Sequence, residues 1–342
     1  MSSKTPSLGW LHAAGTPRQI GFALGKQGRA AVHRHLTPAP IWQQVNRPKL
    51  ADRLAGLTAA TKDGFPDVWE EIEGLAAGLE LPVSQVMAWN CRGDLLAASP
   101  DGCTTVLKPG KNHTVAHNED GLPFFKGSCF IVEAAPKAAP GFRSFCYPGS
   151  LPGHTFAVTE RNLIQTINNL RLRNVTLGAP RMVLARAVLG AGTLDQAVSL
   201  LNQTPSCGGF HMTLAQSGDP RLISIEFGAG QVSTREITTP SLHANHALHL
   251  SGALDHQIIT ASSRDRQRRG DSLLRQPDSD PRAILNDTGG PGLPIRRDRP
   301  DDPDSENTLA TITLTVKPTG VVWSIYEEAS GAPVYRGGHQ PD

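Results

Sequence analysis

The chain has 342 residues, of which 39% are hydrophobic and 19% charged, so it can form one large or two ordinary soluble domains. Its 33 lysine and arginine residues nearly balance its 31 acidic ones, and a net charge of +2 gives no electrostatic reason to expect a nucleic acid or membrane partner. No apolar run approaches the roughly 18 residues of a transmembrane helix. Residues 1–15 lack the apolar stretch of a signal peptide, so we expect a cytoplasmic protein.

The first hundred residues predict mainly helices. Thr16 and Gln19 form a capping-box pattern with a proline between them, which is typical of a helix start and predicts a helix over residues 16–36. A second helix is expected to begin near Pro66, where apolar residues follow at helical spacing. Ser84 is expected to cap a third helix.

After residue 102 the pattern changes to short β-like runs in hairpins. The predicted strands are 104–107, 114–117, 129–134, 144–147, 155–158, 163–167, 212–216, 222–227, 308–316 and 320–326, with helices at 181–189 and 194–201. Residues 276–304 are rich in proline, aspartate and arginine and predict a long surface loop. Antiparallel hairpins with helices grouped before and between them indicate an α+β layered fold rather than a doubly wound parallel sheet.

Cysteine and histidine spacing gives no metal signal. The five cysteines are odd in number and scattered without a CxxC pair, which argues against a zinc site or a disulfide framework and favours buried small side chains. His243, His246 and His249 recur every third residue, but no His-Glu-x-x-His pattern occurs, so structural or substrate-contact roles are favoured over metal binding. We predict no metal and no cofactor.

The segment Asp101-Gly102-Cys103 places a thiol directly after a glycine at the start of a predicted strand. Because glycine takes backbone conformations closed to other residues, the thiol of Cys103 could attack the carbonyl of Gly102 and form a thioester. Water would then cut the chain and leave Cys103 with a free α-amine. With a reference pKa of roughly 7.7–8.0, that amine can act as base for its own thiol. An uncut turn leading into a buried cysteine fits these residues as well.

Three polar groups further along the chain could complete such a site. Asp120 ends the next predicted strand and, if the two strands pair, could hold the new amine; otherwise it is an Asp-Gly turn residue. Asn168 and Asn169 lie together at a predicted strand end, and Asn245 lies between two histidines. A fixed asparagine is a suitable donor to the oxyanion that forms when a thiol attacks an amide.

Four short motifs follow one another in the chain: Gly102-Cys103-Thr104-Thr105, Asn118-x-Asp120, Asn168-Asn169-Leu170 and His243-x-Asn245-His246. In their order and spacing they resemble the acyl-coenzyme A:6-aminopenicillanic acid acyltransferase family, which also contains hydrolases of β-alanyl amines such as carcinine. The resemblance spans roughly residues 15–330.

This resemblance implies the fold of the N-terminal-nucleophile (Ntn) hydrolases, a four-layer α-β-β-α sandwich. It implies self-cleavage into a helix-rich small subunit, 1–102, and a large subunit, 103–342, which stay together as one domain. Cys103 would be nucleophile and, through its amine, base; Asp120 would support the amine and Asn245 would be an oxyanion donor. Further candidate substrate or oxyanion contacts are Thr105, Asn118, Asn168, Asn169, His211 and His246. His211 belongs to the segment 207–211, where members of the resembled family often carry an asparagine, so it is expected to alter the substrate pocket.

The leading hypothesis is therefore a self-processing cysteine amidohydrolase that acts on a small linear amide, such as an N-acyl or β-alanyl amine, without a cofactor. Acyl transfer from a coenzyme A thioester or an amide to an amine is the near alternative, because water or an amine can take the same thioester. The sequence also fits an uncut binding protein with a buried Cys103, or an ordinary Cys-His protease that uses a histidine as base. A homo-oligomer is left open.

Overall fold

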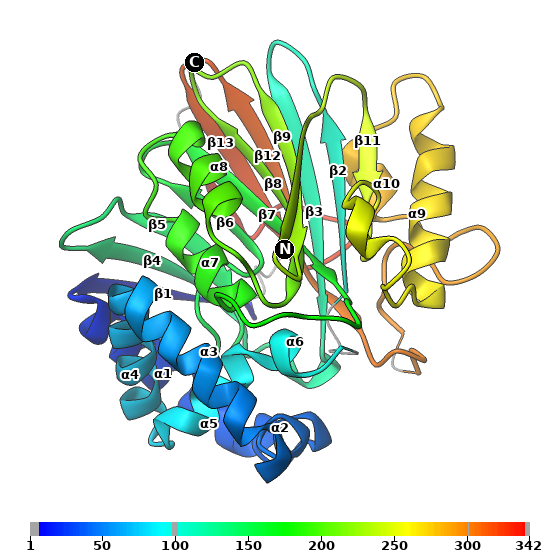
Figure 1. The fold of residues 1–342 in the computed structure, drawn as a ribbon. Helices are drawn as coiled ribbons and strands as arrows, with labels where there is room; N and C mark the ends of the chain where they lie inside the picture. Colours follow the sequence, from blue (N-terminus) through cyan, green and yellow to red (C-terminus); the bar gives the residue numbers. More distant parts are fainter. Residues whose placement is uncertain (1–6, 98–101, 300, 339–342) are drawn as a thin grey trace.

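The computed structural model describes residues 7–97, 102–299 and 301–338, which form two β-sheets with helices packed around them (Figure 1). The larger sheet has the strand order β1-β4-β5-β6-β7-β8-β9-β10, and the smaller has the order β11-β2-β3-β12-β13-β14. Neighbouring strands are antiparallel except β1 and β4, which are parallel. The predicted α+β class is confirmed at this level.

The strands are β1 (Gly9–Gly15), β2 (Gly102–Lys108), β3 (His113–Gly121), β4 (Phe130–Pro136), β5 (Phe142–Cys146), β6 (Phe156–Thr159), β7 (Leu163–Leu170), β8 (Gly209–Gln216), β9 (Leu222–Gly228), β10 (Gln231–Glu236), β11 (Ser241–His243), β12 (Asn307–Lys317), β13 (Gly320–Tyr326) and β14 (Tyr335–Gly337). The α-helices are α1 (Pro17–Ala31), α2 (Pro40–Val45), α3 (Ala51–Gly64), α4 (Pro66–Leu79), α5 (Val83–Asn90), α6 (Arg92–Leu95), α7 (Arg181–Val188), α8 (Leu194–Gln203), α9 (Ala261–Leu274) and α10 (Pro281–Leu285).

The predicted helix starts are confirmed at two of three positions. Thr16 caps α1 through a complete capping box with Gln19, and a π-helical turn at Val32–Leu36 extends the helix to the predicted end. α4 begins at Pro66 as expected. The third start is wrong by two residues, because Pro82 rather than Ser84 is the N-cap of α5 and Ser84 lies inside the helix.

The prediction that residues 276–304 form a long surface loop holds for much of the segment but not for all of it. Asp280 accepts hydrogen bonds from two backbone N–H groups and so caps α10, which begins at a proline. Further along, Ile295, Arg296 and Arg297 are buried. The guanidinium group of Arg297 is paired inside the molecule with Asp302 and lies near Glu306.

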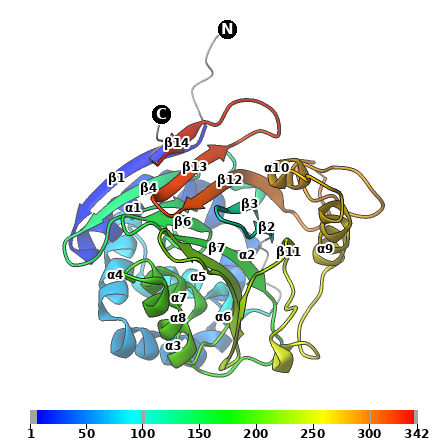
Figure 2. The same ribbon diagram turned by 90° about the horizontal axis from the view of Figure 1, so that it is seen from above.

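The two sheets face each other, and helices pack on their other sides (Figure 2). β2 of the smaller sheet packs against β7 of the larger one. α7 and α8 share an apolar cluster with β7, β8 and β9, whereas α10 packs on β2 and β3 and α9 on β11. Some of the predicted site residues lie between the sheets near β2 and β7, and others lie on the outer face of the smaller sheet.

All five cysteines are buried and free, as the scattered pattern predicted: Cys91, Cys103, Cys129, Cys146 and Cys207. Within the described residues, no helix combines the length and apolar character that a membrane crossing requires.

Candidate active site

Cys103 lies near the start of β2, in register with Glu119 of the antiparallel strand β3. Asp101, the first residue of the predicted motif, is outside the described residues. Gly102 is an extended strand residue rather than one with a positive φ. An added Cβ at this position would come within 2.4 Å of the Glu306 carboxylate, so that buried side chain would have to move. The expected freedom of this backbone is replaced by tight packing.

The backbone of Cys103 is held on both sides of its Cα. Its N–H donates to Oδ1 of Asn245 at 2.9 Å, and its carbonyl accepts from Nη1 of Arg266 at 2.6 Å. Nη2 of Arg266 also donates to Oδ1 of Asn245 at 2.5 Å. Asn245 is tied in turn by its own Nδ2, which donates to the carbonyl of Asn169. The predicted pair Cys103 and Asn245 is thus brought together.

The thiol of Cys103 lies on the face of β2 and β3 that is turned towards the larger sheet. Successive side chains of a strand point to opposite faces, so Thr105 on β2 and His117 and Glu119 on β3 share this inner face with Cys103. Sγ of Cys103 lies 3.8 Å from Oε2 of Glu119. The same carboxylate oxygen is 3.1 Å from Nε2 of His117.

A hydrogen-bonded chain continues from His117 to the larger sheet. Nδ1 of His117 is 2.9 Å from Oγ1 of Thr105, which donates to Oδ1 of Asn168 at 2.7 Å. The hydroxyl of Tyr147 donates to the other oxygen of Glu119 at 2.6 Å. Burial lowers the pKa of His117 to about 3, so its ring is neutral at ordinary pH. This connected polar cluster is buried between the two sheets.

Three of these inner-face groups have the atoms of a metal site. The sulfur of Cys103, a ring nitrogen of His117 and a carboxylate oxygen of Glu119 lie within 4.8 Å of one another. A thiolate, an imidazole and a carboxylate are ligands that Zn²⁺ accepts. The spacing of these residues along the chain does not reveal the group, because strand pairing brings them together.

Asp120 points to the opposite face of β3, towards α9. Its Oδ1 accepts from the hydroxyl of Thr308 at 2.6 Å, and among the described residues its Oδ2 has no hydrogen-bond partner. Burial raises the pKa of this carboxyl, and the nearby charges of Arg266 and Arg297 oppose that rise. The predicted role of Asp120 in holding the amine remains a prediction, since its contacts are made on the other side of the strand.

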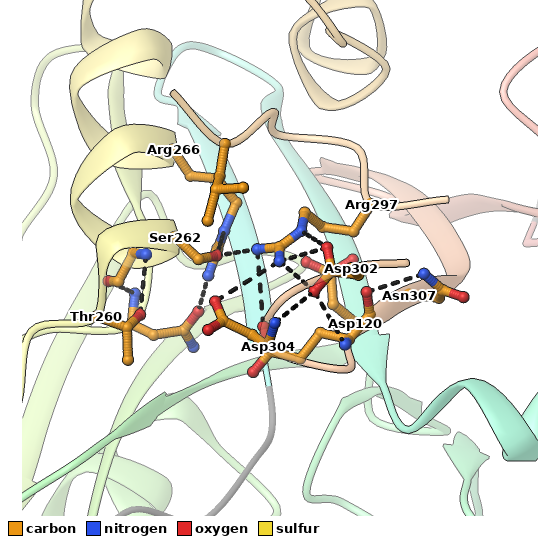
Figure 3. Close-up of polar contacts among 12 residues, drawn as sticks. Asp120, Thr260, Ser262, Arg266, Arg297, Asp302, Asp304 and Asn307 are labelled. Atoms are coloured by element: carbon orange, nitrogen blue, oxygen red, sulfur yellow. Dashed lines mark hydrogen bonds and ion pairs between the residues drawn. The ribbon is translucent and has the colours of Figure 1, made fainter. Parts of the chain in front are cut away.

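Figure 3 shows the charged cluster around Asp120. Arg266 comes from α9 and Arg297 from the segment before β12, and the two guanidinium groups meet at Ser262. Arg297 is paired with Asp302 and lies 3.9 Å from Glu306, which also accepts from Arg171. Arg266 reaches beyond this cluster, because it also contacts the backbone of Cys103.

The remaining predicted contacts are spread around these two faces. On the outer face, Asn118 is bound to the carbonyl of Leu285 and to Thr311. On the inner side, Nδ1 of His211 is 2.9 Å from Oδ1 of Asn168, and its ring stacks on that of His243. His246 lies outside the inner cluster and contacts Ser263.

Sequence reasoning missed several residues of this site. They are Glu119, His117, Tyr147, Arg266, Arg297 and Glu306. A period-of-two reading of β2 and β3 would have placed Glu119 beside Cys103 once the register was known. The two arginines lie in segments that look like solvated, charged surface.

Comparison with known proteins gives two findings. The profile of the family described as "Acyl-coenzyme A:6-aminopenicillanic acid acyl-transferase" matches residues 107–330, well over half of the chain, starting just after Cys103. The beta-alanyl-dopamine/carcinine hydrolase of Drosophila melanogaster is 26% identical over 220 residues, which cover 56% of this chain and 56% of that relative. The chain thus matches little more than half the length of this hydrolase.

Proposed function

The chain belongs to the acyl-coenzyme A:6-aminopenicillanic acid acyltransferase family, and on this premise we propose that it is a self-processing cysteine amidohydrolase. It cuts its own chain between Gly102 and Cys103 and then hydrolyses a small linear amide. The similarity to a beta-alanyl-dopamine/carcinine hydrolase supports an N-acyl or β-alanyl amine as the substrate class.

One observation carries this proposal: the backbone of Cys103 is fixed by Asn245 and Arg266, while its thiol faces a different, polar side of the strand. A structural cysteine needs no such side-chain contacts, because the N–H and carbonyl of a strand residue usually form hydrogen bonds with the backbone of neighbouring strands. The arrangement suits a residue whose nitrogen becomes a reacting group. After the cut, Oδ1 of Asn245 is in place to accept from the new amine.

Turnover then follows from this geometry. The amine of Cys103 takes the thiol proton, the sulfur attacks the amide carbon, and Nδ2 of Asn245 is the proposed donor to the oxyanion. The leaving amine takes the proton and departs, which leaves a thioester on Cys103. Water attacks the thioester, the amine of Cys103 again accepts and returns the proton, and the acid leaves. The cation of Arg266 beside the amine favours its neutral, basic form.

We further propose that the two sheets and their helices are the four layers of an Ntn hydrolase. The helices of the N-terminal part with α7 and α8 would form one outer layer, and α9 with α10 the other. In this proposal residues 1–102 and 103–342 are the two subunits of one domain. This view is supported by β1, which is hydrogen-bonded to β4 in the larger sheet.

Acyl transfer is the second candidate, and the family description favours keeping it. The thioester on Cys103 would be formed from an amide or a coenzyme A thioester and taken by an amine instead of water. A purified enzyme that forms only the free acid in the presence of excess amine acceptor would rule this candidate out.

The proposal is tested by the intact mass of freshly purified protein beside its Cys103→Ala variant. We expect two fragments in the wild type, with Cys103 at the new N-terminus, and one uncut chain of 36.5 kDa in the variant. A full-length chain in both would contradict self-processing and favour a non-catalytic binding protein. Cleavage at another bond would contradict the role of Cys103.

A further inference from the structure

The first cut poses a chemical problem that later turnover does not have. Before cleavage the nitrogen of Cys103 is part of a peptide bond, and an amide nitrogen is not a base. The thiol must therefore give its proton to a different group when it attacks Gly102. The acidic side chain in contact with the thiol is Glu119, whose Oε2 lies 3.8 Å from Sγ.

The direction of the hydrogen bonds around Glu119 can be worked out from Asn168. Its Nδ2 donates to the carbonyl of His243 at 3.0 Å, so its oxygen is the atom that faces Thr105. Thr105 has a single hydroxyl proton, which it donates to the side-chain oxygen of Asn168. The hydroxyl oxygen of Thr105 must then accept from His117, which fixes the proton of the neutral ring on Nδ1.

With Nδ1 protonated, Nε2 of His117 presents a lone pair towards Glu119. Two lone pairs at 3.1 Å repel each other, so a proton must lie between Nε2 and Oε2. Both side chains are buried between the sheets, where a separated charge pair is costly, so the neutral pair with its proton on Glu119 is favoured at rest. His117 and Glu119 are thus a coupled pair that holds one proton beside the thiol.

We propose that Glu119, backed by His117, takes the proton of the Cys103 thiol in the uncut chain and so starts the self-cleavage. This inference rests on the proposed self-processing function. The thiol proton moves to Oε2 of Glu119 while the proton already on Glu119 moves to Nε2 of His117. Sulfur then bonds to the carbonyl carbon of Gly102, and the bond from that carbon to the nitrogen of Cys103 breaks. The departing nitrogen takes back one proton, which returns the pair to its resting state.

Charge balance supports this route inside a buried site. Before the transfer the thiol, the carboxyl and the ring are all neutral; afterwards the thiolate is balanced by the imidazolium, with Glu119 neutral between them. A buried site tolerates such a balanced pair far better than a lone charge. Tyr147 donates to the second oxygen of Glu119 and so fixes the carboxyl group in place. Thr105 fixes the ring in the same way.

Glu119→Gln is a sharp test because it keeps the local hydrogen bonds. The amide oxygen can accept from Tyr147 and the amide N–H can donate to Nε2 of His117, but the side chain can no longer take up the thiol proton. General bases contribute about 10²- to 10⁴-fold to a rate, so we expect cleavage at least 10²-fold slower than in the wild type. Glu133→Gln, the same change at a half-buried position on β4, should cleave at the wild-type rate.

Hydroxylamine separates the two steps of cleavage, because it cuts a thioester but not a peptide bond. We expect it to leave the slow cleavage of Glu119→Gln unchanged, since the thioester does not form. His117→Asn supplies a second test if the first variant does not melt cooperatively: the asparagine can still donate to Thr105 but offers Glu119 no ring nitrogen. It should be slowed at the same, hydroxylamine-insensitive step.

The outcomes distinguish this inference from the proposed function. A wild-type chain that stays uncut removes the proposed function itself. A wild type and a Glu119→Gln variant that cleave at equal rates overturn the inference and leave the function standing. Rescue of the variant by hydroxylamine also overturns it, because the thiol would then have attacked without Glu119.

Discussion

At the scale of single residues, the strand carrying Cys103 separates two kinds of environment. On its outer face Arg266 binds the Cys103 carbonyl and Thr104, beside a buried cluster of acids and arginines. On its inner face lie hydrogen-bonding groups that lead from Glu119 to Asn168. The backbone of the proposed nucleophile is therefore held by a cation, while its thiol meets the groups to which we assign the proton transfer. One strand can contact both environments because its successive side chains point to opposite faces of the sheet.

Thr105 tests whether the inner-face chain acts as a unit. Thr105→Val keeps the shape of the side chain but removes one hydrogen bond from Nδ1 of His117 and one from Oδ1 of Asn168. We expect the free energy of unfolding to fall by about 1–3 kcal/mol, together with slower self-cleavage, because the ring of His117 is no longer fixed. Urea denaturation and the fragment time course measure the two effects.

A neighbouring threonine supplies the control for this substitution. Thr166 on β7 is fully buried, and its hydroxyl has no hydrogen-bond partner among the described residues. Thr166→Val should therefore leave stability unchanged or raise it. Equal losses in the two variants would mean that the valine itself, rather than the broken chain, causes the effect at Thr105.

The sequence predicts the residues of this site that local chemistry identifies, but not those that strand register places there. Cys103 and Asn245 were found because a thiol after glycine and an asparagine suit amide chemistry, and the structure brings them into contact. Asp120 was predicted because it ends the strand that follows Cys103, and Glu119 beside it was not considered. The choice between these neighbours depends on strand register, and a shift by one residue exchanges the two faces. Register is set by packing of the whole sheet, which local patterns do not contain.

At the scale of secondary-structure elements, α1 and α4 cross with almost no side chain between them. Gly21 and Gly25 of α1 meet the backbone of α4, and Gly74 and Gly78 of α4 meet that of α1. The sequence predicted both helices from caps and apolar spacing, but it did not predict this contact. A glycine lowers the helix propensity of its segment, but it does not reveal which other backbone packs against it. β1 was missed for a related reason, since it pairs with a strand more than a hundred residues away.

The close contact between α1 and α4 predicts the direction in which a glycine substitution changes the free energy of unfolding. At Gly25 an added Cβ would lie 2.3 Å from the Leu75 carbonyl oxygen, so the two backbones must separate. We expect Gly25→Ala to destabilise the fold by about 1–3 kcal/mol, although alanine is the better helix former by about 1 kcal/mol. Gly64, at the end of α3, has nothing within 4 Å of its added Cβ, so Gly64→Ala should be neutral or stabilising. Thermal melting compares them, and a stabilised Gly25→Ala would contradict the close contact.

At the scale of the whole molecule, the N-terminal part is built into the larger sheet. β1 pairs with β4 over its full length, and the side chain of Asn90 binds the backbone of Gly149 and Leu151. Glu71 of α4 forms a buried bidentate pair with Arg186 of α7. The family resemblance seen in four motifs is confirmed by the profile match, whereas these long-range contacts could not be inferred from motifs. A cut after Gly102 would break the covalent chain but would leave all of these non-covalent interactions in place.

This architecture predicts that the two fragments remain one particle with a new dependence on concentration. Unfolding of the uncut Cys103→Ala chain is unimolecular, so its melting temperature should not change with protein concentration. Unfolding of the cut wild type separates two chains, so its melting temperature should rise with concentration, as mass action requires. Gel filtration should give one peak at the size of the 36.5 kDa chain or a multiple of it, and that peak should contain both fragments. Elution of residues 1–102 as a separate peak would contradict the single-domain arrangement.

Replacing Arg186 by alanine should weaken the association, because Glu71 is left as a buried, unpaired charge, at a cost of about 3–5 kcal/mol.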